Sequence, residues 1–172
     1  MYAALAKAIL DDANRERAGR DLDRLRERHP RASRDELAAR VIRRGALQCA
    51  AAGGLLAGPA AFFGAMPFGA DLAYQAVALN RMVLALARLY GADGSAPARV
   101  AGAVGGIAAG LGSELFRQAL VRTLRSALPR RPGFRAAAGA IAGGVLGYAA
   151  GIAVGRFARN TFAERRRFFG LG

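Results

Sequence analysis

Residues 136–155 read AAAGAIAGGVLGYAAGIAVG, a run of 20 residues without a charge between Arg135 and Arg156. Residues four apart lie nearly above one another on a helix, so a glycine at every fourth position forms one continuous stripe. A glycine inside a helix costs about 1 kcal/mol relative to alanine in water. We therefore expect glycine-zipper packing, in which a second helix approaches the bare backbone and offsets this cost. This glycine stripe consists of Gly139, Gly143, Gly147, Gly151 and Gly155.

Two other stretches share this character. A shorter stripe lies upstream, but only 14 uncharged residues separate Arg99 from Glu114, fewer than the roughly 20 that a membrane span needs. Residues 45–70 carry no charge and are long enough to span, with a kink expected at Pro59. The sequence thus contains two candidate spans, 45–70 and 136–155. The shorter stripe consists of Gly102, Gly106 and Gly110.

The composition predicts an all-α chain. Hydrophobic residues make up 53% and are dominated by alanine, and no stretch alternates apolar and polar side chains as a strand would. We expect a membrane-embedded or membrane-associated helical bundle. It divides into a charged, solvent-exposed N-terminal helix within residues 1–30, an Ala/Gly-rich domain over 31–160, and a basic, aromatic tail over 161–172.

Several helix boundaries are visible in the sequence. Ser33 and Glu36 have the spacing of a capping box, which predicts a helix beginning at Arg34. Pro67-Phe68-Gly69 is typical of a turn. A further helix over about 70–90 is expected to end at Gly91, because glycine favours the left-handed C-cap conformation.

The net charge of +14 favours anionic partners. Residues 1–44 hold 12 basic and 8 acidic side chains, whereas residues 45–172 hold 14 and 4, so the more apolar part is also the more basic one. This combination favours acidic lipid over nucleic acid. The arginines expected to bind lipid headgroups are Arg117, Arg122, Arg125, Arg130, Arg131, Arg135, Arg165, Arg166 and Arg167.

No pattern in the sequence points to catalysis or to a cofactor. His29 is the single histidine and Lys7 the single lysine, which excludes a His-based triad, a multi-His metal site and a P-loop. Cys49 is the single cysteine, and we expect a small buried thiol. We therefore predict a non-enzymatic protein.

Two carboxylates, Asp71 and Glu114, stand beside apolar segments. One interpretation makes them proton or ion sites at membrane depth. The favoured interpretation is structural: they cap helices or pair with the arginines Arg81, Arg88 or Arg117.

The order of these features resembles the bacterial membrane-associated YcjF family, and in part the EcsC-like proteins. The resemblance covers about residues 29–160. It implies membrane association and names a GTPase as a candidate partner, but it supplies no catalytic residues. The glycine stripes also resemble the glycine-zipper motif of bacterial envelope proteins. The matching stretches are HPRASRDELAARVIRRGA (29–46), PFGADL (67–72), NRMVLALARLYG (80–91), Leu128-Pro129 and Gly155-Arg156-Phe157.

The sequence therefore favours a bacterial inner-membrane protein with a cytoplasmic N-terminus, acting as a structural or accessory subunit. Its partners would be anionic lipids and either further copies of itself or a larger membrane complex. Two alternatives stay open at this point. One is a soluble Arg-rich bundle that binds nucleic acid or an acidic protein, and the other is a glycine-zipper pore.

Overall fold

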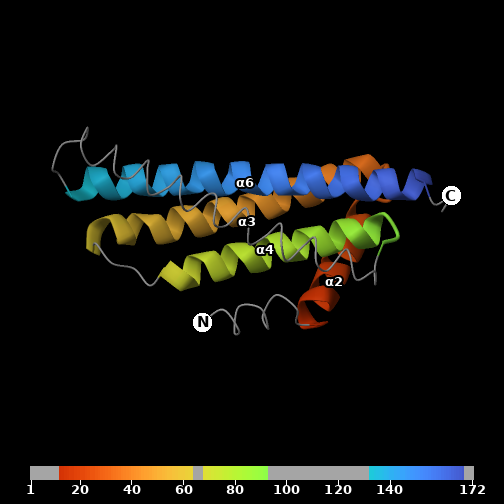
Figure 1. Ribbon diagram of the computed structural model, residues 1–172, viewed down its shortest axis with the longest axis horizontal. Coiled ribbons are helices and arrows are strands. Elements are labelled where there is room, and N and C mark those ends of the chain that lie inside the picture. The colour runs from red at the N-terminus through yellow and green to blue at the C-terminus, as the bar shows by residue number, and fades with distance from the viewer. Residues whose placement is uncertain (1–11, 64–67, 93–131, 169–172) are drawn as a thin grey trace.

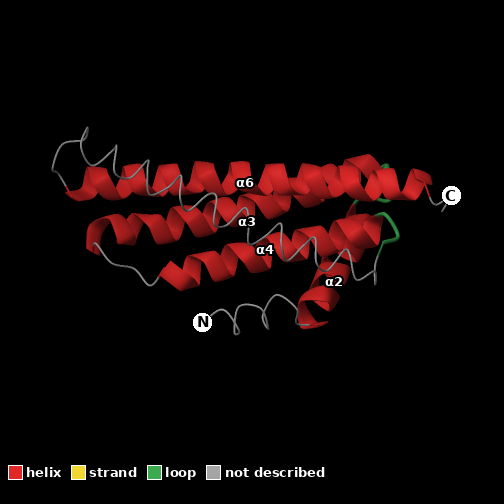
Figure 2. Cartoon of the chain, viewed as in Figure 1, coloured by secondary structure: helices red, strands yellow, loops and turns green. Residues whose placement is uncertain are grey.

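The computed structural model describes residues 12–63, 68–92 and 132–168, and within them every regular element is a helix (Figures 1 and 2). This confirms the all-helical prediction for the described part of the chain. α3 and α6 each contain a long uncharged segment, residues 45–63 in α3 and residues 136–155 in α6. The helices are α2 (Asp12–Arg28), α3 (Arg34–Phe63), α4 (Phe68–Leu89) and α6 (Pro132–Phe168).

Three of these helices form an elongated layer. α3, α4 and α6 lie side by side along the long axis, with α3 antiparallel to the other two (Figure 1). The most extensive interface joins α3 to α6, while α4 packs against both. α2 crosses one end of this layer at a steep angle and packs mainly on α4. We call this end the α2 end and the opposite one the far end.

The boundaries of two helices follow local rules. The Ser33 amide donates to Glu36 Oε2 at 2.7 Å, and the Glu36 amide donates to Ser33 Oγ at 3.3 Å, which confirms the capping box at the start of α3. Gly91 adopts a φ of +77° just after α4, and the Ala92 amide donates to the Ala87 carbonyl at 2.8 Å. This confirms the glycine C-cap.

Two expectations differ from the structure. Of the expected turn Pro67-Phe68-Gly69, Phe68 and Gly69 belong to the first turn of α4, while Pro67 lies outside the described residues. A proline is tolerated at a helix start because its missing N–H would have no partner there, so Pro-Phe-Gly can open a helix as well as form a turn. α6 runs through the expected boundary at residue 160 and continues to Phe168, so residues 161–168 of the expected tail are helical.

The hydrophobic core is densest where α2, α3 and α4 meet. Its fully buried large side chains come from all three helices. α2 contributes one inward-facing side to this core, while the charge pairs Arg20–Glu16 and Arg26–Asp23 lie on its surface. The charged helix is thereby attached to the bundle. The largest fully buried residues are Leu22, Cys49, Leu79, Val83 and Leu86.

Candidate functional site

The side of α6 that carries the glycine stripe faces α3. A β-carbon on Gly151 would lie 2.6 Å from Ala46 Cα, and one on Gly147 would lie 2.8 Å from the Cys49 carbonyl carbon. β-carbons essentially never come this close to other heavy atoms, so the two backbones approach more closely than any larger residue would allow. Only glycine fits these positions without a displacement of α3.

The contacts run in an antiparallel order along the two helices. Gly53 of α3 lies opposite Gly143, toward the far end, and Ile42 lies opposite Gly155, toward the α2 end. Gly144 and Gly54 lie at the edge of this interface, where a β-carbon on Gly144 would be 3.4 Å from the nearest atom, an ordinary contact distance. The interface between α3 and α6, which we call the seam, is therefore tightly packed along Gly147, Gly151 and Gly155 and less tightly packed at Gly144.

Other residues singled out from the sequence are less fully described. Gly139 belongs to α6, one turn before the seam contacts, and its own contacts are outside those described. The side chains of four arginines on α6, Arg135, Arg165, Arg166 and Arg167, are likewise outside the described set. The remaining candidates lie outside the described residues altogether: Gly102, Gly106, Gly110, Glu114, Arg117, Arg122, Arg125, Arg130 and Arg131.

The opposite side of α6 exposes large apolar side chains. Ile141 is 68% exposed, Val145 is 63% exposed, and Tyr148 continues the same side one turn later. We call these three residues the outer face. Phe157 is also 70% exposed, but it lies nine residues after Tyr148 and therefore on a different side of the helix. Sequence reasoning concentrated on the glycines and missed this face, although its spacing of three and four residues on the side opposite the stripe could have indicated it.

α6 also meets the criteria for a membrane span. Its segment Ala140–Glu164 contains an 18-residue window with a mean hydropathy of 1.4 and, by length and composition, is able to cross a bilayer. Only 28% of its apolar window is buried in the protein, whereas the core helix of a soluble bundle would be mostly buried. Within the described residues this is the one helix segment that passes the test. The upstream run 45–70 includes residues outside those described.

Arginines from three helices lie at one level of the bundle. Gly45 contacts Met82, and Ile42 contacts Gly155, which places Arg43 and Arg44 of α3 near Arg81 of α4 and Arg156 of α6 along the axis. The span of this level is about one and a half helical turns, or about 8 Å. We call these four residues the arginine belt.

The belt bounds an uncharged zone. From Arg44 to the end of α3, and from Arg156 back to Arg135 near the start of α6, neither helix carries a charged residue. The 20 residues between Arg135 and Arg156 extend about 30 Å, the thickness of a bilayer core. On α4 the zone is shorter, because Asp71 lies in the first turn of that helix.

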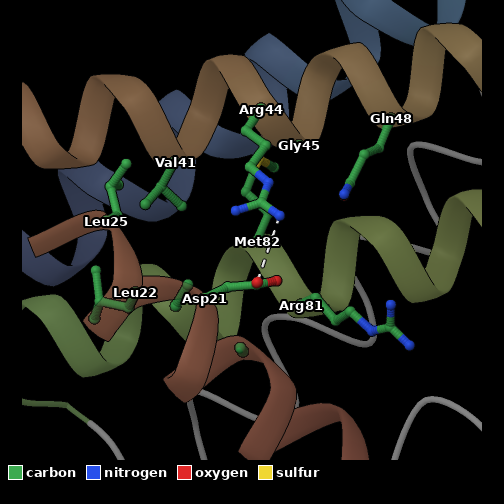
Figure 3. A pocket seen from close by; sticks show the side chains of 11 residues that line it. Asp21, Leu22, Leu25, Val41, Arg44, Gly45, Gln48, Arg81 and Met82 are labelled. Atoms are coloured by element: carbon green, nitrogen blue, oxygen red, sulfur yellow. Dashed lines mark hydrogen bonds and ion pairs between the residues drawn. The ribbon is translucent and has the colours of Figure 1, made fainter. Parts of the chain in front are cut away.

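At the α2 end, α2 supplies partners for arginines of the bundle. Arg44 pairs with Asp21 at 3.4 Å, and Figure 3 shows the two side chains pointing toward each other across a pocket of about 50 Å³. The pocket is smaller than a metabolite. Each ion pair between half-exposed groups contributes about 0–1 kcal/mol.

Two further arginines, both on α4, also bind α2. Arg88 pairs with Asp23 at 3.4 Å, and Arg81 Nε donates to Asn14 Oδ1 at 2.7 Å. The expected pairing of Asp71 or Glu114 with one of these arginines stays a prediction, because the Asp71 side chain and all of Glu114 lie outside what the structure describes. The contacts that are described show that Arg81 and Arg88 of α4 both reach α2.

Two groups at the α2 end have shifted pKa values. Burial raises the pKa of Tyr90, and its hydroxyl donates to Asp35 Oδ1 at 3.0 Å, which favours the protonated form further. The hydrogen bond from the Ser33 amide lowers the pKa of Glu36 below its usual 4.5. Neither group lies in a cleft beside a nucleophile, so both shifts belong to structural contacts.

The described residues offer little reactive chemistry. Cys49 is buried, as predicted, and faces the seam. His29 contacts Arg40 through Nε2 at 3.2 Å. In the described ranges no three His, Cys, Asp or Glu side chains are grouped so that they could hold a metal ion. Comparison with family models, with curated proteins and with solved structures finds no match.

Proposed function

We propose that this chain is a non-enzymatic membrane protein in which α3 and α6 cross the bilayer as a tightly packed antiparallel pair. The outer face of α6 contacts lipid, and the arginine belt binds anionic headgroups. The observation that carries the proposal is the outer face itself: a helix of spanning length leaves Ile141, Val145 and Tyr148 exposed on the side away from its partner.

Water is a poor environment for such a face. Exposed large apolar side chains that continue over several turns of one helix are typical of a surface that contacts lipid or another protein. The zone containing Ile141 and Val145 is about as long as a bilayer core and ends at arginines. Arginines at that level have stems long enough to extend along apolar surface while their guanidinium groups bind phosphate.

The orientation follows from the arginines that precede the uncharged part of α3. Because Arg40, Arg43 and Arg44 lie on that side, the positive-inside rule favours a cytoplasmic α2 and N-terminus in a bacterial inner membrane. In this role the chain is a structural or accessory subunit, and the resemblance to YcjF-type proteins supports a GTPase among its candidate partners.

The position of the glycine stripe bears on self-association. From Gly143 to Gly155 the stripe lies against α3 of the same chain. A pore or oligomer built through this stripe would require α3 to leave it. Contacts between copies would therefore form through the outer face or through parts of the chain outside the described residues.

Extraction of isolated membranes with alkaline carbonate tests the proposal. We expect the chain to stay in the pellet after the wash and to enter solution only with detergent. Recovery in the supernatant, as a monodisperse species that binds RNA or DNA in a salt-dependent manner, would support the soluble alternative instead.

A pair of variants makes the test specific to the outer face. Val145→Arg places a charge at bilayer depth, which costs about 2.5–3.5 kcal/mol on the insertion scale. We expect it to shift the chain into the supernatant. Asn160→Arg adds the same charge to the same helix beyond the belt and serves as the control. Equal retention of both variants in the membrane pellet would contradict lipid contact at Val145.

A further inference from the structure

The carboxylates of α2 occupy arginines that a phosphate-rich surface would also bind. Asp21 pairs with Arg44 and Asp23 pairs with Arg88, each at 3.4 Å. We propose that α2 is an autoinhibitory cover, which neutralises Arg44 and Arg88 and is displaced when an anionic lipid surface competes for them. The proposal rests on the membrane function above, because the competing ligand is lipid.

The fit between α2 and Arg88 supports a specific contact. A β-carbon on Gly19 would collide with the Arg88 guanidinium, so this guanidinium lies directly on the bare α2 backbone on its way to Asp23. Asp23 Oδ1 also pairs with Arg26 of α2 at 3.6 Å, which holds the carboxylate in place. α2 therefore contacts Arg88 in two ways: Gly19 leaves room for the guanidinium group, and Asp23 supplies the opposite charge.

The contact is also open to competition. The side chains of both ion pairs are about half exposed, so a phosphate can approach the arginines from solvent. The apolar contact of α2 with the core rests on few positions, because within this helix Ala18 and Leu22 are its buried hydrophobic residues and Leu25 is only partly buried. Weak surface pairs and a small apolar contact are features of segments that open locally.

The position of Arg44 selects a lipid surface as the competitor. Arg44 is the last charged residue before the uncharged part of α3 and belongs to the arginine belt. In the proposed orientation this level coincides with the headgroup phosphates, and α2 crosses this end of the bundle (Figure 1), where Asp21 faces Arg44 (Figure 3). Headgroup phosphates and Asp21 therefore compete for the same side chain, Arg44.

Thiol labelling in lipid nanodiscs tests the proposal on the full chain. Ala18→Cys reports from the buried side of α2, and Ala85→Cys reports from the α4 surface below it, both in a Cys49→Ala background. We expect both thiols to be protected in phosphatidylcholine. In phosphatidylglycerol nanodiscs both should react faster, by roughly 2- to 30-fold, the range that loss of two exposed ion pairs allows.

A matched pair of variants separates specific pairing from net charge. Asp21→Asn with Asp23→Asn removes the two bundle-facing carboxylates, so labelling should already be fast in phosphatidylcholine. Glu16→Gln with Glu27→Gln changes the net charge equally; Glu16 pairs within α2, with Arg20, and Glu27 is exposed. This control should behave like the parent. Equal acceleration by both double variants would overturn the proposal.

Three outcomes then remain distinct. Labelling that is independent of lipid composition, in a chain that stays in the nanodisc, refutes the cover and leaves the membrane function intact. If the chain fails to enter bilayers, the membrane function falls, and acceleration by anionic vesicles added to the free protein still supports the cover. Acceleration by RNA but not by anionic vesicles overturns the lipid assignment in favour of nucleic acid.

Discussion

Alanine substitutions at two neighbouring glycines of α6 provide the most direct test of the seam. Gly147 faces the Cys49 backbone, where a β-carbon would lie 2.8 Å from the carbonyl carbon, while a β-carbon on Gly144 would make an ordinary contact at 3.4 Å. Both substitutions add one methyl group to the same helix, three positions apart. They differ in what that methyl group meets.

The magnitude follows from two opposing terms. Alanine is favoured over glycine inside a helix by about 1 kcal/mol, and this gain is the same at both positions. At Gly147 the methyl group meets backbone rather than a flexible side chain, so α3 and α6 must separate, and overpacking of this kind costs about 1–3 kcal/mol. Gly147→Ala should therefore be less stable than Gly144→Ala by about 1–3 kcal/mol, whatever the shared helix term is in detergent.

Thermal unfolding in detergent, followed by circular dichroism, measures this difference. For a chain of this size 1 kcal/mol corresponds to about 2–4 °C in Tm, so the two variants should differ by roughly 2–12 °C. Gly144→Ala should match or exceed the parent chain. Equal Tm values for the two variants, or a lower value for Gly144→Ala, would refute close backbone contact at Gly147.

Three further predictions concern the α2 end and the buried thiol. The raised pKa of Tyr90 adds to the free energy of unfolding; this contribution is fully present below the ordinary pKa of 10.0 and is lost as the pH rises through the higher folded value. Tyr90→Phe should therefore remove this alkaline decrease in the free energy of unfolding. An unchanged decrease would exclude Tyr90 as its source. Ser33→Ala removes the cap of α3 and should cost about 1 kcal/mol in denaturant unfolding, with a change under a few tenths showing that the cap contributes little. Cys49 should react with a maleimide only after unfolding, and rapid reaction of the native chain would contradict its burial against α6.

The local features of the fold could be read from the sequence because they depend on neighbouring residues. The capping box at Ser33 and Glu36 and the glycine C-cap at Gly91 use contacts within five positions, and both occur where expected. The turn expected at Phe68 and Gly69 is wrong because a proline is compatible with both a turn and a helix start. Local sequence preferences do not decide between a turn and a helix start at this position, so the packing of the helices decides it.

The relations between helices required the structure. The spacing of the glycines indicated that something approaches α6, but it did not name the partner, and α3 occupies the seam within the same chain. The alignment of Arg44, Arg81 and Arg156 at one level depends on the register of three helices, which no single helix encodes. The contacts of Arg81 and Arg88 with α2 join positions more than 60 residues apart.

The seam between α3 and α6 has a consequence for synthesis of the chain. Gly53 and Gly143 meet across it although 90 positions separate them. At the usual rates of translation a ribosome needs roughly 5–20 s to extend the chain over that distance. During this interval the newly made α3 and α4 must remain folded on each other while the glycine side of α3 has no α6 to cover it. Conditions that slow elongation in this stretch should therefore increase degradation of the nascent protein.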